Sequence, residues 1–111
     1  MRVKDLVEAS GFTRHAIRHF TKLKLLNVER IGDPIQQHYP PESLVVLYTI
    51  KELKAARFKL QDIKKYLQAS TTDKLTLLKQ QDLRLYRGIK DIRAAQRKVA
   101  SLIEQLERTQ P

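Results

Sequence analysis

The sequence predicts a mainly α-helical protein: a winged helix-turn-helix domain with a small β-hairpin wing, followed by a long C-terminal coiled-coil helix. Three observations favour this fold. A short amphipathic segment, a glycine and a cationic helix follow one another within residues 3–22, as in a helix-turn-helix. Two short β-capable pieces then surround a Gly-Asp-Pro turn. Over the last third of the chain, apolar residues recur every seven positions, which is typical of a coiled coil.

The helix-turn-helix is predicted from helices at 4–10 and 13–22, with Gly11 in the turn between them. The hydroxyl of Thr13 can cap the second helix by accepting from the amide of His15 or Ala16. Basic side chains and histidines share one side of this helix, while Ala16, Ile17 and Phe20 lie on the other. Because the second helix of such a motif lies in the DNA major groove, we expect DNA contacts from one set of residues. They are Thr13, Arg14, His15, Arg18, His19 and Lys22.

The wing is predicted from strands at about 28–31 and 35–39, joined through Gly32-Asp33-Pro34. Gln37 and Tyr39 are further candidates for DNA contact. Two interpretations of Tyr39 stay open: its hydroxyl donates to a phosphate, or its ring packs on the domain.

Two helices are predicted after the wing, at 41–56 and 60–68. Pro40 and Pro41 end the wing, and proline suits the first turn of the helix that follows. The first of these helices carries an apolar stripe that we expect to be core: Leu44, Leu47, Ile50 and Leu53, with Tyr48 beside them. The second presents Leu60, Ile63 and Leu67 on one face.

The last predicted helix covers 73–108 and is expected to be capped by Thr72 or Asp73. One apolar row is spaced by sevens: Leu78, Leu85, Ile92, Val99 and Leu106. Leu75, Ile89 and Ile103 form a partial second row. Asp82 and Gln96 interrupt that row, and buried polar side chains there would fix the register of a coiled coil. A helix of this length cannot bury such a seam against a domain of 70 residues, so we expect a homodimer. The expected dimerisation residues are Leu78, Leu85, Ile89, Ile92, Val99 and Ile103.

Composition narrows the classes of function. The formal net charge is +10 over 111 residues, which favours a polyanionic partner. That partner is either nucleic acid or an acidic membrane surface, and the mixed charges on the last helix lead us to expect no membrane partner. The chain has no cysteine, no long apolar run and no apolar signal region, so we expect a cytoplasmic protein. No catalytic constellation or glycine-rich phosphate loop is present, so we predict neither an enzyme nor a cofactor. His15 and His19 have a spacing that can bind a metal ion, but no third ligand is near in sequence, and we favour groove contact without a metal.

The segment VKDLVEASGFTRHAIRHFTKLKLL resembles the opening of MerR-family regulators. Ile17-Arg18-His19-Phe20 stands where the family has Leu/Ile-Arg-Tyr-Tyr/Phe, and Leu25-Leu26 where it has a Leu-Leu pair. The likeness covers about residues 1–68, and the long last helix resembles the family's antiparallel dimerisation helix.

The chain departs from the family pattern at several positions. His19 replaces a tyrosine, and Gln37 replaces an arginine of the wing that contacts phosphate. Lys24 and Arg57 both replace glycines, before Leu25 and Phe58 respectively. Wing contacts with DNA are therefore expected to differ more from the family's than the contacts of the recognition helix.

The resemblance implies a DNA-binding domain at 1–70 and a dimerisation helix at 71–111. It implies a transcriptional regulator that binds double-stranded promoter DNA as a homodimer and distorts it, with RNA polymerase as a further partner. Two alternatives stay open. One is an excisionase-like architectural DNA-binding protein, although such proteins are usually shorter. The other is a basic coiled-coil adaptor for a protein or a membrane, although the mixed charges on the last helix are not typical of a membrane-surface helix.

Overall fold

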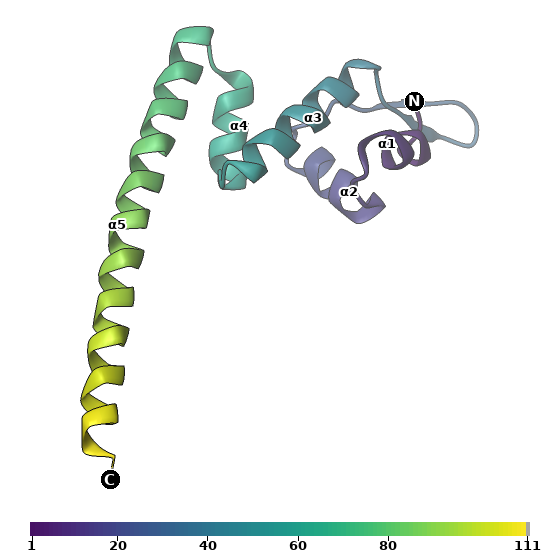
Figure 1. Cartoon of the computed structure of the whole chain (residues 1–111). Helices are drawn as coiled ribbons and strands as arrows, with labels where there is room; N and C mark the ends of the chain where they lie inside the picture. The colour runs from purple at the N-terminus through teal and green to yellow at the C-terminus, as the bar shows by residue number, and fades with distance from the viewer. Residues whose placement is uncertain (111) are drawn as a thin grey trace. The chain divides into compact units, whose positions relative to one another are not determined.

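The computed structural model describes residues 1–110. Five helices and one hairpin follow the predicted order (Figure 1). The elements are α1 (Val3–Ser10), α2 (Arg14–Lys22), β1 (Glu29–Ile31), β2 (Gln36–His38), α3 (Glu42–Ala55), α4 (Leu60–Gln68) and α5 (Thr71–Thr109). The chain forms two compact units that divide between Ala69 and Ser70.

The core of the first unit is built from apolar side chains that α1 to α4 present to one another. Fully buried side chains come from every one of these helices: Leu6, Ile17, Leu47, Ile50 and Ile63. The apolar sides predicted for α2 and α4 are therefore the buried sides, and burial of each such side chain stabilises the fold by roughly 1.5–3 kcal/mol.

The stripe predicted for α3 needs one correction. Leu47, Ile50 and Leu53 are buried and Leu44 is partly buried, but Tyr48 is 47% exposed. Its hydroxyl donates to the carbonyl of Ala9 over 3.1 Å. Tyr48 lies beside the stripe in sequence, but it reaches across the surface to the end of α1 instead of entering the core.

The turn between α1 and α2 has the predicted chemistry. Gly11 has a φ of 78°, a left-handed conformation that suits glycine, and it ends α1. The Thr13 side chain accepts from the amide of Ala16 over 3.1 Å, which confirms the predicted cap of α2.

Two helices end on residues that carry a positive φ without being glycine. Lys24 follows α2 with a φ of 62°, and Arg57 follows α3 with a φ of 64°. The next residue returns to the core in both cases: the Leu25 amide donates to the Phe20 carbonyl over 2.9 Å, and the Phe58 amide donates to the Leu53 carbonyl over 3.0 Å. These are the bonds of a Schellman ending, in which glycine is the usual left-handed residue.

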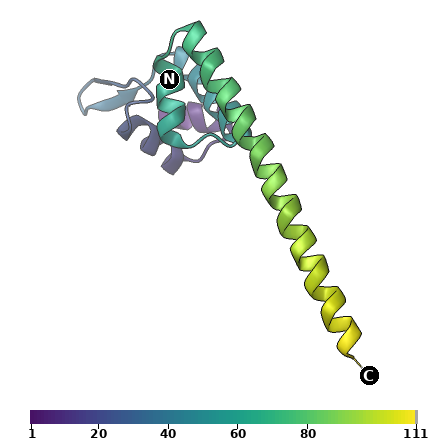
Figure 2. The same ribbon diagram turned by 90° about the vertical axis from the view of Figure 1, so that its left-hand side faces the viewer.

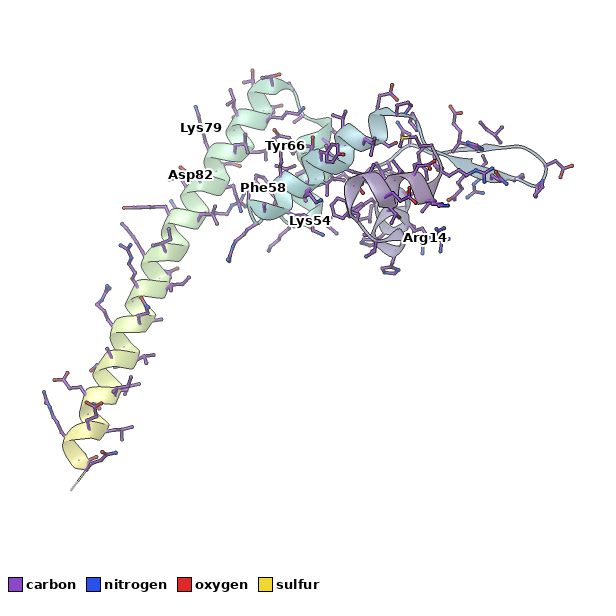
Figure 3. All side chains as sticks on the ribbon, turned by 45° about the vertical axis from the view of Figure 1, so that its right-hand side comes forward. Arg14, Lys54, Phe58, Tyr66, Lys79 and Asp82 are labelled. Atoms are coloured by element: carbon purple, nitrogen blue, oxygen red, sulfur yellow. The ribbon has the colours of Figure 1, made fainter. Side chains whose placement is uncertain are left out.

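These endings turn apolar side chains into the core. Phe58 is buried, and its ring lies edge-on to that of Tyr66 in α4, with the ring centroids 6.4 Å apart (Figure 3). The reversal after α3 therefore places α4 against the domain.

The hairpin projects from the helical part of the first unit (Figure 2). Its strands pair antiparallel in the register Glu29 to His38, Arg30 to Gln37 and Ile31 to Gln36. Each strand is one residue shorter than predicted at its outer end, and β2 also begins one residue later than predicted, at Gln36. Tyr39 leaves the ladder because its backbone pairs with Met1 instead: its amide donates to the Met1 carbonyl over 2.6 Å, and its carbonyl accepts from the Met1 amino group over 2.7 Å.

The second unit is the helix α5, 39 residues or about 58 Å long. Its predicted cap was wrong: the hydroxyl of Ser70, not of Thr72, accepts from the amide of Asp73 over 3.2 Å. The helix accordingly begins at Thr71, earlier than expected. Across residues 1–110, no helix is long and apolar enough to cross a membrane.

The predicted seam of α5 is exposed in the single chain. The six residues expected to mediate dimerisation have exposed fractions between 37% and 63%. Three of them, Ile92, Val99 and Ile103, line an apolar groove of about 450 Å³ together with Ala95, Gln96 and Ala100.

Candidate nucleic-acid interface

A cleft of about 560 Å³ lies between α2 and the hairpin. Nine residues line it: His15, Arg18, His19, Thr21, Lys22, Val28, Arg30, Gln37 and Tyr39. Three of these are basic, two are histidines and none is acidic. The cleft therefore favours an anionic ligand on electrostatic grounds.

One wall of the cleft is the predicted basic side of α2. His15, Arg18, His19 and Lys22 all line it, and all four are solvent exposed. The opposite side of the helix holds Ile17 and Phe20 in the core. Burial of these two residues fixes the rotation of α2 about its axis, and so aims the basic side chains outward.

Aromatic packing also fixes the start of α2. Phe12 lies edge-on to Phe20, with ring centroids 5.2 Å apart. The ammonium group of Lys54 in α3 lies 5.9 Å from the Phe12 ring centroid and 5.6 Å from that of Phe20 (Figure 3). These contacts tie α2 to α3, so that the wall of the cleft rests on a packed scaffold.

Two of the residues expected to contact DNA lie outside the cleft. Thr13 and Arg14 sit at the N-terminal end of α2 and are exposed, and Figure 3 shows Arg14 at the outer surface of the domain. The first turn of a recognition helix is the part that reaches base edges in helix-turn-helix proteins. Thr13 and Arg14 can therefore contact a DNA groove, but they do so from a position outside the cleft.

The ring of Tyr39 packs in the core, with 2% of the residue exposed. Its hydroxyl lies at the wall of the cleft, 2.8 Å from that of Thr21. Thr21 donates its own proton to the Ile17 carbonyl, so Tyr39 is the donor of the bond between the two hydroxyls. With that proton already used, the structure supports packing over phosphate donation for Tyr39.

Sequence reasoning missed Arg30 as a residue of the site. Arg30 and Gln37 are directly opposed in the ladder, and both line the cleft. The family resemblance predicts an arginine at position 37, where this chain has glutamine. The neighbouring strand supplies Arg30 instead. The strand register identifies Arg30 as a residue of the cleft. The sequence predicts that register only to within a residue or more.

The histidines of α2 give no metal centre with their neighbours. His15 and His19 both line the cleft, but within residues 1–110 no group of three or more His, Cys, Asp or Glu side chains is placed to hold a metal ion. Both side chains are instead available as polar groups facing the cleft.

The sequence profile of the MerR HTH family regulatory proteins matches residues 1–70, the part of the chain that carries α1 to α4 and the hairpin. No curated protein matches the chain.

Two solved structures share the fold. A protein from Listeria monocytogenes assigned to the MerR family of transcriptional regulators superposes with a TM-score of 0.63 at 19% identity, covering 98% of this chain and 87% of that one. A MerR-family transcriptional regulator from Bacillus cereus superposes with a TM-score of 0.67 at 18% identity, covering 97% of this chain and 78% of that one. At such identities the likeness extends to the fold, the predicted winged helix-turn-helix with a long last helix.

Proposed function

Because this chain belongs to the MerR family of helix-turn-helix regulatory proteins, we propose that it is a sequence-specific transcriptional regulator that binds promoter DNA as a homodimer. Residues 1–70 serve as the DNA-binding domain and residues 71–111 as the dimerisation helix. The family is one of DNA-binding regulators, which is not a class of enzyme.

The observation that carries this proposal is the cleft beside α2. It is lined by Arg18, Lys22 and Arg30 with no carboxylate among its nine residues. Arginine and lysine neutralise phosphates, and arginine also bonds guanine through two N–H groups. We assign DNA contact to Thr13, Arg14, His15, Arg18, His19, Lys22 and Gln37, with Tyr39 as a supporting residue of the cleft wall.

The exposed seam of α5 supports the homodimer. Two apolar rows spaced by sevens run along one side of the helix, and a second copy of the same helix is the occupant that matches their spacing and length. Asp82 and Gln96 interrupt one row, and polar residues at such positions select one register. A two-fold dimer would present two copies of α2 to two half-sites of a pseudo-palindrome.

Distortion of the promoter belongs to the same proposal. Family membership supports a mode of action in which the bound dimer bends or untwists a promoter whose −35 and −10 elements are too far apart, so that RNA polymerase engages both. The energy of deforming the DNA then contributes to the choice of site.

Selection of bound duplexes from a random DNA pool tests the proposal most directly. Enrichment of a pseudo-palindromic site, together with a dimer mass in sedimentation equilibrium, is the expected result. In vitro transcription from that site, with the spacer between promoter elements varied, then tests the distortion. Binding without any enrichment would point to an architectural protein, and binding to anionic vesicles but not to DNA would point to an adaptor.

A further inference from the structure

The apolar groove of α5 has the lining of two adjacent holes of a coiled coil. In such a structure four residues on one helix bound each hole, and one side chain of the partner helix fills it. The two holes share a pair of residues: Ile92, Ala95, Gln96 and Val99 bound one, and Gln96, Val99, Ala100 and Ile103 bound the other. The side chains that enter this groove therefore define the register of the dimer.

The charges of α5 favour a second copy that runs in the opposite direction. Two parallel copies would place each apolar row opposite itself, so that Asp82 faced the partner's Asp82 and two like charges were buried together. In an antiparallel pair the first row faces the second, and Asp82 meets an apolar residue. The family resemblance implies the same direction, but it leaves the register open.

Antiparallel helices can pair in registers that differ by one heptad, or about 10 Å along the axis. With Ile103 level with the partner's Leu78, the partner's Asp82 exchanges water for a groove whose only polar side chain is the neutral Gln96. With Ile103 level with the partner's Ile92, the partner's Gln96 enters the groove, and the two helices overlap over fewer residues. Both registers therefore place a polar side chain in the groove.

The register between these two fills the groove with apolar side chains alone. With Ile103 level with the partner's Leu85, the partner's Ile89 and Ile92 lie over the two holes. Asp82 then lies near the end of the paired stretch, where water reaches it. Burial of apolar surface therefore selects this register.

The residues that flank the two rows match by size in the same register. Tyr86 lies against the partner's Ala100, and Leu102 lies against the partner's Gly88. Tyr86 and Leu102 are 56% and 47% exposed in the single chain, so both have surface to bury. A Cβ added at Gly88 would meet no atom within 4 Å, so the space beside it is open. Each large side chain thus faces a small one.

Charge on the same flank agrees with this register at its ends. Lys79 faces the partner's Glu107, an attractive pair at the rim of the seam. Arg93 meets the partner's Arg93 at the two-fold axis, where the length of the side chain lets both charges stay in water.

We propose that two copies of α5 pair antiparallel with Ile103 level with the partner's Leu85, and that the size match of Tyr86 with the partner's Ala100 selects this register. The register rests on the proposed function, since it needs the homodimer. It also bears on the operator, because a shift of one heptad changes the separation of the two points where α5 begins by about 10 Å, the rise of about three base pairs.

Disulfide cross-linking tests the register, and the described part of the chain has no cysteine of its own. Full-length Ile103→Cys is co-expressed in turn with Leu78→Cys, Leu85→Cys or Ile92→Cys, and each pair is then oxidised. Only Leu85→Cys should give a cross-linked heterodimer, because a disulfide needs Cα atoms within about 7 Å and the other two cysteines are displaced by about 10 Å. Ile103→Cys alone should not cross-link, since its two copies lie about 27 Å apart along the axis.

The outcomes separate the register from the proposed function. A cross-link through Leu78→Cys or Ile92→Cys would overturn the register, and Ile103→Cys cross-linked to itself would show parallel helices; each leaves the homodimer standing. No cross-link in any pair, with a dimer mass in sedimentation equilibrium, would also overturn the register. A monomer mass for the unaltered chain would contradict the homodimer itself.

An exchange variant tests the size match without cysteines. Tyr86→Ala should weaken dimerisation by about tenfold or more, because each dimer loses the burial of two rings. Tyr86→Ala/Ala100→Tyr moves the ring to the other side of the same contact and should restore most of the affinity. Leu83→Ala is the matched control, since Leu83 is 53% exposed and lies outside both rows and their flanks. An equal effect of Leu83→Ala, or no recovery in the exchange variant, would refute the size match.

Discussion

The hydroxyl groups of Thr21 and Tyr39 lie 2.8 Å apart and join the last turn of α2 to the residue that follows β2. Tyr39 also exchanges two backbone bonds with Met1, so one residue connects the chain start, the helix and the hairpin. The width of the cleft depends on this junction, because its two walls are α2 and the hairpin.

Tyr39→Phe should lower the free energy of unfolding by about 1 kcal/mol, because it removes one partly buried hydrogen bond and leaves the Thr21 oxygen without its donor. Urea denaturation followed by circular dichroism measures this. Tyr86→Phe is the control, since Tyr86 is 56% exposed on α5 and should show almost no change. Equal effects of the two substitutions would mean that the junction contributes nothing to stability.

Lys24→Gly should raise the stability of the first unit by about 1 kcal/mol, because a left-handed backbone strains any residue with a Cβ more than it strains glycine. The midpoint of urea denaturation should increase without a change in slope. Lys65→Gly, within α4, should have the opposite sign, since glycine weakens a helix interior by about the same amount. A loss of stability in Lys24→Gly would show that the lysine side chain makes contacts worth more than the strain.

Arg18→Ala should weaken binding to a selected operator by about 1–3 kcal/mol and relax the preference at one base pair if Arg18 contacts a base. If it contacts phosphate, all duplexes should lose affinity equally. Fluorescence anisotropy on the operator and its single-base variants separates the two cases. Arg84→Ala on α5 is the control, and an Arg18→Ala protein that binds as well as Arg84→Ala would remove Arg18 from the interface.

Replacing Leu85, Ile92 and Val99 with lysine should convert the proposed homodimer to a monomer, because three side chains of the seam would each lose roughly 1.5–3 kcal/mol of burial. Sedimentation equilibrium should then give the monomer mass, and operator binding should fall sharply. Gln80, Ala94 and Ser101 lie on the opposite side of the helix, and their replacement with lysine adds the same charge. A dimer that survives the seam substitutions would refute the assignment of the interface.

Features that depend on residues close together in the chain could be predicted from the sequence. Helix ends were placed within two residues, and the Thr13 cap was identified by its partner, because capping depends on side chains and amides only a few residues apart. The cap of α5 was missed because Ser70, Thr72 and Asp73 all have capping side chains and the sequence does not rank them.

Contacts between distant segments could not be obtained in this way. Tyr39 and Tyr48 both lie beside apolar residues in the sequence. Tertiary packing places the Tyr39 ring in the core, whereas the Tyr48 hydroxyl reaches the Ala9 carbonyl at the surface. The sequence likewise does not predict the left-handed backbone at Lys24 and Arg57. It shows only that these two residues stand where the family has glycine.

By itself, the sequence determined the order of elements, the basic side of α2 and the seven-residue spacing of α5, because hydrophobic periodicity depends only on the order of residues in the chain. The tertiary structure alone decided that Arg30 faces α2 across a cleft and that Glu29 faces away. Strand register sets that choice, and a shift of one residue would exchange the two faces.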